Sequence, residues 1–224
     1  MKKFIFNNKQ IQKMAYWIVK KKKLLANPDL YIECKKRTIN ERFFLNDKHL
    51  KDCKVLSCRE KLLEYMPKNG VCAEVGVAEG FFSEKILEIC KPFKLYLIEY
   101  DQGNCIKLRE KFKKEISEER VELLEGDSVE MLRKLENKSL DFVYLDATHD
   151  YEHPHNELCE CQNKVKNEGF ICGHDYTRFS MWEQEQYGVI EAVNEFMVEN
   201  NYEMKFLTLD MLHSNSSYCM QKIN

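Results

Sequence analysis

The fold is indicated by residues 71–80, which read Val71-Cys72-Ala73-Glu74-Val75-Gly76-Val77-Ala78-Glu79-Gly80. An apolar strand leads into a turn with two glycines, and a helical pattern begins directly after the turn. Glycines let the backbone turn tightly and approach a ligand, and the N–H groups at the start of the next helix point outward. This strand-turn-helix unit therefore predicts a small-molecule site.

A second predicted strand, Leu95-Tyr96-Leu97-Ile98, ends in Glu99, nineteen residues past Gly80. In an open α/β sheet, an acid at this point faces the diol of a ribose. Asp101 is a competing candidate for the same contact. The glycine spacing is E-x-G-x-x-x-G and not the G-x-G-x-x-G of dinucleotide sites. Two carboxylates at adjacent strand ends thus suggest a nucleoside ligand without a pyrophosphate.

Strand and helix patterns alternate from residue 71 onward. Strands are expected at 71–75, 94–99, 120–124, 140–145 and 168–172, and helices at 80–90, 103–116, 128–136 and 154–166. That alternation predicts a parallel sheet with right-handed crossovers. Beyond it we expect a helix at 188–200 and strands at 203–209 and 217–222. Ahead of it, residues 40–54 read as irregular and 58–65 as a short helix.

The charge of the chain is divided unevenly along its length. Residues 1–69 hold 18 Lys and Arg against 7 Asp and Glu, whereas residues 70–224 hold 17 against 30. We therefore expect a basic helical arm over 1–69 and one catalytic domain over 70–224, a size that suits a single buried core. The arm could pack on its own domain or on a sister subunit, bind an anionic acceptor, or lie on a membrane surface.

The ten cysteines are scattered, and several fall inside apolar strands, which is how reduced and buried thiols are distributed. A reducing, cytoplasmic location is therefore expected. No apolar run approaches the roughly 20 residues that span a bilayer, so no transmembrane segment is expected.

At these motifs the chain resembles the class I S-adenosylmethionine (SAM)-dependent methyltransferases, whose first motif has an acid ahead of the glycine turn. The runs LDFVYLDATHDYE at 140–152 and GFICGHDY at 169–176 resemble the branch of macrolide-sugar O-methyltransferases and cephalosporin hydroxylase-like proteins. The resemblance implies a Rossmann-like, doubly wound, seven-stranded and mostly parallel α/β sheet that closes with an antiparallel C-terminal hairpin. It also implies that SAM methylates a hydroxyl of a small polar acceptor, such as a sugar or a nucleotide-linked sugar.

Ligands of such sheets bind beyond the carboxyl ends of the strands, where this chain is polar. The residues expected to bind the cofactor are Glu74, Gly76, Gly80, Glu99, Asp127 and Ser128. Asp127 has a second interpretation, because aspartate is also favoured as the N-cap of a helix.

The resemblance further implies a Mg²⁺ site and a base at the ends of the later strands. Asp146 and Asp175 match the metal-binding positions, and His174 stands where related enzymes usually have another carboxylate or an amide. His149, three residues after Asp146, matches the position of the catalytic base, and imidazole titrates near neutrality. The alternatives are that both aspartates cap helices and that a loop carbonyl or Asp150 holds His149. His153 and His155, which flank Pro154, are interpreted as helix-start residues.

Three other functions are weighed against this one. An NAD-dependent enzyme is disfavoured because the G-x-G-x-x-G motif of dinucleotide sites is absent from the sequence. An RNA methyltransferase could use the basic arm, although nucleic acid is not the expected partner. A non-enzymatic SAM-fold module is disfavoured by the set Asp146, His149 and Asp175. A homodimer is a further possibility for the arm.

Overall fold

The computed structural model describes residues 44–180, 185–210 and 215–223. Contacts within the chain define a compact unit, Phe43–Asn224, that contains all of them. The basic amphipathic helix expected near the N-terminus lies outside the described residues. No helix among the described residues has the length and apolar character needed to cross a bilayer.

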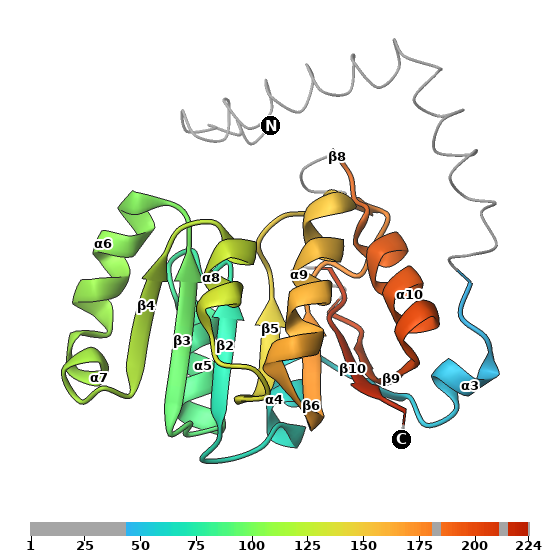
Figure 1. Ribbon diagram of the computed structural model, residues 1–224, viewed down its shortest axis with the longest axis horizontal. Helices are drawn as coiled ribbons and strands as arrows, with labels where there is room; N and C mark the ends of the chain where they lie inside the picture. The colour runs from blue at the N-terminus through green and yellow to red at the C-terminus, as the bar shows by residue number, and fades with distance from the viewer. Residues whose placement is uncertain (1–43, 181–184, 211–214, 224) are drawn as a thin grey trace, which may run out of the picture. The chain divides into compact units, whose positions relative to one another are not determined.

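An eight-stranded sheet forms the centre of this unit, in the order β1-β9-β10-β6-β5-β2-β3-β4 (Figure 1). β10 runs antiparallel to both of its neighbours, and the other pairs are parallel. The α/β class and the closing hairpin are confirmed, but the sheet has eight strands where seven were expected. The strands are β1 Lys54–Leu56, β2 Val71–Val75, β3 Lys94–Glu99, β4 Val121–Glu125, β5 Leu140–Leu145, β6 Val165–Gly173, β9 Tyr202–Thr208 and β10 Tyr218–Lys222.

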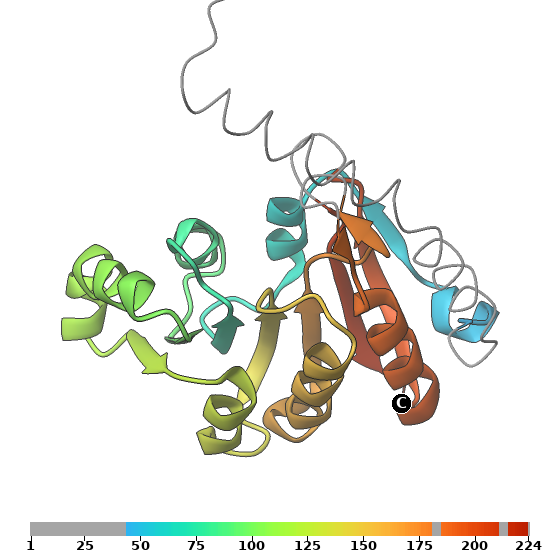
Figure 2. The ribbon, with the colours of Figure 1, turned by 90° about the horizontal axis from the view of Figure 1, so that it is seen from above.

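Helices cover both faces of the sheet, as the view from above shows (Figure 2). One buried cluster joins the sheet to α4, α5 and α6 through residues such as Leu63, Ile86 and Leu108. The other joins it to α8, α9 and α10, with Leu158 and Phe196 at its centre. The helices are α3 Asp47–Leu50, α4 Arg59–Tyr65, α5 Phe81–Ile89, α6 Gln102–Lys111, α7 Lys113–Ser117, α8 Ser128–Lys134, α9 Glu152–Lys164 and α10 Val189–Asn200.

Local capping explains where two helices begin. The Asp101 carboxylate accepts a hydrogen bond of 2.8 Å from the backbone N–H of Asn104 and starts α6. The Asp127 carboxylate accepts one of 3.0 Å from Glu130 and starts α8. Each side chain satisfies a donor that the first helical turn leaves without a partner.

The sequence prediction differs from the structure mainly before residue 70. Residues 40–54 were expected to be irregular, yet α3 forms, and β1 pairs in parallel with β9 at the edge of the sheet. A three-residue strand is too short to show a readable period. Residues 44–69 therefore pack within the compact unit, whereas the sequence analysis placed them in the arm. The small hairpin of β7 Phe179–Ser180 and β8 Glu185–Gln186 was also not predicted.

Candidate functional site

Two cavities open beyond the carboxyl ends of the parallel strands, each about 450 Å³ in volume. The first cavity lies past β2, β3 and β4, and the second lies past β2, β5 and β6. They share part of their walls, formed by Gly76, Ala78, Asp146 and Ala147. Two ligands bound there would meet across this shared wall.

Two backbone hydrogen bonds fix the carboxylate of Glu99 in the wall of the first cavity. Its carboxylate accepts hydrogen bonds from the backbone N–H groups of Ala78, at 2.7 Å, and Asp101, at 2.8 Å. The side chain is buried but still reaches the cavity wall. Glu99 thus joins the glycine turn to the loop after β3, and Asp101, the competing candidate, is engaged as the cap of α6.

The two glycines of the turn serve different purposes. Gly76 has a φ of +80°, and a Cβ there would lie 2.2 Å from the carbonyl oxygen of Asp146. Gly80 has a φ of +74°, and its Cβ would meet Leu108 at 2.7 Å. Gly76 lines both cavities, whereas Gly80 lines neither and lets α5 pack closely against α6. Close packing and the positive φ explain a glycine at position 80, and its predicted cofactor contact stays a prediction.

Glu74 lies deep beneath the turn and lines the second cavity rather than the first. The hydroxyl of Ser83 donates a hydrogen bond to its carboxylate. Burial raises the pKa of Glu74 to about 7, against the opposing effects of Ser83 and Arg59. The predicted cofactor contact of Glu74 therefore stays a prediction that its placement does not favour.

Asp127 and Ser128 line the first cavity, as predicted. Asp127 also caps α8, which confirms its interpretation as an N-cap, and its cofactor contact stays a prediction. The Ser128 hydroxyl lies 2.7 Å from Nε2 of His153, and His153 lines the same cavity. The sequence analysis treated His153 as a helix-start residue. It does lie in the first turn of α9, and only the fold of α9 beside α8 brings it to the cavity.

The second cavity holds a cluster of Asp146, His149 and Asp175. One ligand-type atom of each lies within 4.8 Å of the others, and Nε2 of His149 is 2.8 Å from Oδ2 of Asp175. The His149 ring stacks on Tyr187 with a centroid separation of 4.2 Å. Three predicted residues from two loops are thus brought together.

His174 does not join this cluster, although it was predicted as a metal ligand. Its Nδ1 lies 2.9 Å from the Ser217 hydroxyl, and its Nε2 is 3.9 Å from Asp175. Burial lowers the pKa of His174 to about 4, so the ring is neutral. The structure places His149 in the position beside the two aspartates that the sequence analysis gave to His174.

The pKa values of the two aspartates in the cluster are shifted in opposite directions. Burial raises the pKa of Asp146 well above its usual range, the charge of Asp175 adds to this, and Arg59 opposes it. Burial also acts to raise the pKa of Asp175, but hydrogen bonds from His149 and Asn215 help to lower it overall. Asp175 is therefore the ionised partner of His149.

Arg59 is a site residue that the sequence analysis missed. Its Nη1 lies 3.4 Å from Oδ2 of Asp146, and its guanidinium sits 4.7 Å from the centre of the Phe82 ring. It belongs to the first turn of α4, in the segment assigned to the arm. No local motif marks it, because its contacts depend on the packing of α4 over the loops.

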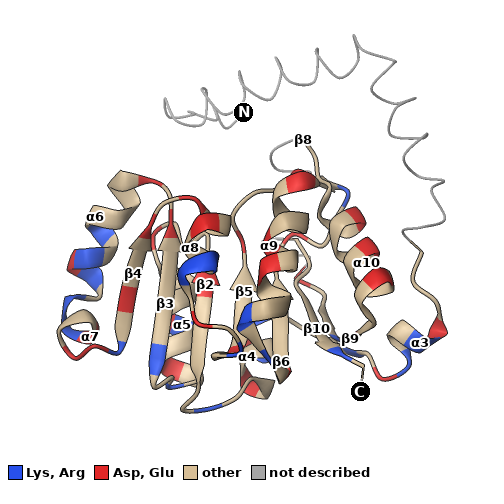
Figure 3. Cartoon of the chain, viewed as in Figure 1, with Lys and Arg blue, Asp and Glu red and all other residues tan. Residues whose placement is uncertain are grey.

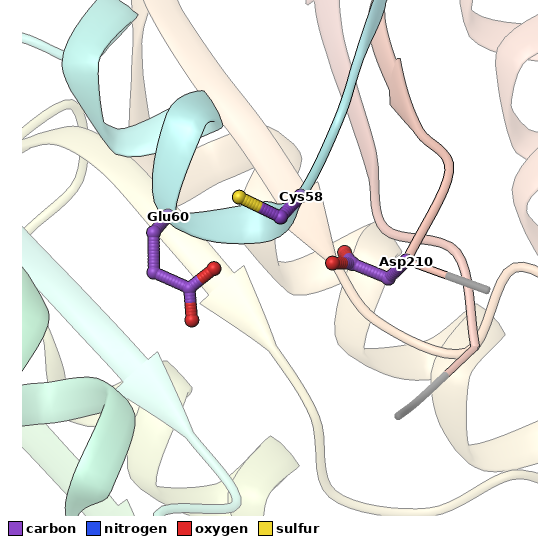
Figure 4. A group of neighbouring side chains, drawn as sticks. All are labelled: Cys58, Glu60 and Asp210. Carbon is purple, nitrogen blue, oxygen red and sulfur yellow. The ribbon is translucent and has the colours of Figure 1, made fainter. Parts of the chain in front are cut away.

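A second group of possible cation ligands lies nearby but lines neither cavity. Figure 4 shows Cys58 and Glu60 at the start of α4 and Asp210 in the segment after β9. Burial raises the pKa of Asp210, and the charge of Glu60 adds to this. The group flanks Arg59 in sequence without sharing its cavity.

Residues 73–176 match the family model described as a methyltransferase domain. No curated protein sequence matches the chain. The pyocyanin biosynthetic protein PhzM is a similar solved structure at 13% identity, with a TM-score of 0.57 over 73% of this chain and 54% of that one. This chain thus spans about half the length of PhzM.

Two further solved structures share the fold. The B. subtilis tRNA methyltransferase TrmK has 12% identity and a TM-score of 0.57 over 75% of this chain and 67% of its own. A geranyl diphosphate methyltransferase in complex with SAM has 8% identity and a TM-score of 0.58 over 74% and 84%. Residues 73–176 are thus similar to a methyltransferase domain, and the solved structures show that the chain shares the fold of such enzymes.

Proposed function

We propose that the domain transfers the methyl group of SAM to a hydroxyl of a small polar acceptor, and that this acceptor is a sugar. The observation that carries the proposal is the wall shared by the two cavities. Methyl transfer is an in-line displacement, so cofactor and acceptor must meet with their reacting atoms aligned. SAM in the first cavity and the acceptor in the second would meet at Asp146 and Ala147.

The first cavity suits a nucleoside. Glu99 offers carboxylate oxygens to ribose hydroxyls from a position fixed by two backbone N–H groups. Gly76 lines the cavity and lets the turn approach the backbone of Asp146, because a Cβ there would overlap that backbone. Asp127 and Ser128 line the far side of the cavity. These residues would bind and orient SAM.

His149 is the residue that we propose as proton acceptor for the attacking hydroxyl. Asp175 is ionised and 2.8 Å from Nε2, so it favours the tautomer with a proton on that nitrogen. Nδ1 is then the basic nitrogen, and the carboxylate stabilises the imidazolium once the proton arrives. The ring is also held flat against Tyr187, which limits its rotation.

The cluster of Asp146, His149 and Asp175 also fits a divalent cation such as Mg²⁺, because carboxylate oxygens and one imidazole are common ligands. When bound, the ion would lower the pKa of the acceptor hydroxyl. The two aspartates would hold the ion, while Asp175 continues to orient His149 as the proton acceptor.

The charge of the second cavity favours a neutral acceptor. Its walls include the carboxyl groups of Glu74, Glu79, Asp146 and Asp175, and Arg59 is the one Lys or Arg among its described lining residues. A sugar offers many hydroxyl groups without adding negative charge. A phosphate on a nucleotide-linked sugar would need Arg59 as its cationic partner among these lining residues.

The proposal is tested by incubating the full chain with methyl-labelled SAM and free sugars, nucleotide-linked sugars or bulk tRNA, with and without a chelator. We expect label on a sugar, loss of label after chelation, and recovery with Mg²⁺. Binding of S-adenosylhomocysteine (SAH) should survive chelation, because the ion serves the acceptor. Full activity after chelation would rule out a role for the metal ion and leave His149 as the base without its help. Label on no hydroxyl compound would contradict the proposal.

An RNA methyltransferase is the alternative that the basic N-terminal residues favour, and TrmK shows that this fold can act on tRNA. It predicts RNA binding that weakens steeply with salt, because phosphate contacts release counterions. A non-enzymatic module would instead bind SAH without any transfer.

Location and oligomeric state are also proposals. The nine described cysteines are all free, which supports a reducing, cytoplasmic location. Mass measurement in solution would test the homodimer.

A further inference from the structure

A buried polar group links α8 to α9 behind the first cavity. The Ser128 hydroxyl lies 2.5 Å from Oε1 of Glu157 and 2.7 Å from Nε2 of His153. Nε2 of His153 is also 3.5 Å from the Glu157 carboxylate. Figure 1 shows the two helices side by side on one face of the sheet. Ser128 and His153 line the cavity, and Glu157 stands behind them.

Glu157 is an acid in a place where a charge is costly. Its residue is 1% exposed, and burial raises its pKa to about 7 against the effect of the Ser128 hydrogen bond. The charges of Asp127 and Asp150 raise it further. The other titratable groups facing it are His153 and Cys161 on α9 and Tyr218 on β10.

The state of Glu157 decides the direction of the hydrogen bonds. A serine hydroxyl has one proton to give and can accept others. When Glu157 is ionised, Ser128 donates to it and must accept from His153, which places the ring proton on Nε2. When Glu157 is protonated, it can donate to Ser128, and Ser128 can then donate to His153. The ring proton moves to Nδ1 in that arrangement.

We propose that Glu157 is a positioning residue of the cofactor site, which fixes the hydrogen-bond direction that Ser128 and His153 present to the cofactor. The inference rests on the proposed binding of SAM in the first cavity and goes beyond it, because Glu157 lines no part of that cavity. The amino group of adenine is a hydrogen-bond donor. Ionised Glu157 leaves Nδ1 of His153 unprotonated and able to accept such a hydrogen bond, whereas protonated Glu157 places the ring proton on Nδ1. The ionised arrangement therefore suits the cofactor better.

The sign of the pH effect follows from this preference. Cofactor binding favours ionised Glu157, so affinity is highest above about pH 7 and falls as the pH drops through the pKa of the carboxyl group. The fall can reach about tenfold for each pH unit over which binding and protonation compete.

The test is calorimetry of SAH binding to the full chain between about pH 6 and pH 8.5, using the wild type, Glu157→Gln and Ser128→Ala. We expect the SAH affinity of the wild type to fall several-fold, and by no more than about tenfold, between pH 7 and pH 6. Glu157→Gln should bind with a nearly flat profile, because glutamine accepts the Ser128 hydrogen bond without titrating. Ser128→Ala should also be flat, because the link between Glu157 and His153 is missing.

Both variants keep the other ionisable groups of the two cavities, among them Glu74, whose pKa burial also raises to about 7. A wild-type profile that persists in Glu157→Gln would therefore assign the titration to one of them and overturn the inference. A flat wild-type profile with normal SAH binding would overturn it as well. Failure of the folded wild type to bind SAH at any pH would instead remove the proposed cofactor site, and the inference with it. Thermal unfolding of each variant checks that it is folded.

Discussion

The two cavities are built from the chain in different ways. The first cavity draws most of its wall from consecutive strand ends between Gly76 and Ser128, where the backbone fixes the main acid, Glu99. The second cavity gathers Arg59, Asp175 and Asn215 from segments far apart in sequence. A local motif can specify the first kind of site, whereas only the finished fold specifies the second.

The cavities also differ in what holds their charges. Glu99 is bound by backbone N–H groups, which do not titrate. In the second cavity Asp146 is paired with Arg59 and Asp175 with His149, and the charge of Asp175 acts against ionisation of Asp146. Substitutions in the second cavity should therefore leave cofactor binding in the first cavity nearly unchanged. Turnover, in contrast, should depend on the side-chain pairs of the second cavity. The predictions below test that separation.

The largest effect is expected from His149→Ala. Removal of a positioned proton acceptor lowers turnover by about 10²–10⁴-fold. SAH affinity should stay within about twofold of the wild type, since His149 lines only the second cavity. Steady-state kinetics with calorimetry of the same preparations measures both quantities. The matched control is His155→Ala, a histidine on α9 that lines neither cavity and should leave both unchanged.

A parallel loss of turnover and SAH affinity in His149→Ala would break the separation between the cavities. Normal turnover in that variant, with His174→Ala inactive, would move the base to His174.

A smaller effect, on stability and cofactor binding together, is expected from Gly76→Ala. A non-glycine residue at positive φ and the overlap with Asp146 should cost on the order of 2–4 kcal/mol of unfolding free energy. Denaturant unfolding measures the loss, and SAH affinity should fall with it.

The matched control is Gly103→Ala, inside α6, where a Cβ meets just one atom, at 3.1 Å. That variant should be equally stable or more stable. Equal stability of Gly76→Ala would refute the close approach of the turn to Asp146.

The smallest effect is expected from Glu99→Ala, which should weaken SAH binding by about 1–3 kcal/mol because ribose hydroxyls lose their acceptor. Calorimetry measures it, and Asp101→Ala is the comparison. If only Asp101→Ala loses SAH affinity, the ribose contact would belong to Asp101 instead of Glu99.

The separation also explains what the sequence could predict. The strands β2, β3 and β5 begin and end at the predicted residues, because apolar runs and flanking polar residues bound them clearly. Glu99, Gly76, Asp127 and Ser128 follow from their places after these strands, and all four line the first cavity. Gly80 lines neither cavity and packs against α6, and the spacing of a glycine does not tell close packing from ligand contact.

The second cavity was predicted in part. Asp146, His149 and Asp175 follow strand ends and were identified, but the choice of His149 over His174 as their neighbour depends on side-chain direction, which sequence does not carry. Arg59 reaches this cavity through the packing of α4. His153, in contrast, reaches the first cavity through the packing of α9 on α8. Contacts between distant elements leave no period or spacing to read.

The central claim is that cofactor and acceptor meet at the wall between the two cavities. A crystal structure of the full chain with SAH tests it most directly, through the position of the sulfur atom. The account predicts the ribose on Glu99, the adenine beside Asp127 and Ser128, and the sulfur at Asp146 and Ala147, facing His149. Adenosine bound in the second cavity, or sulfur pointing away from His149, would contradict it.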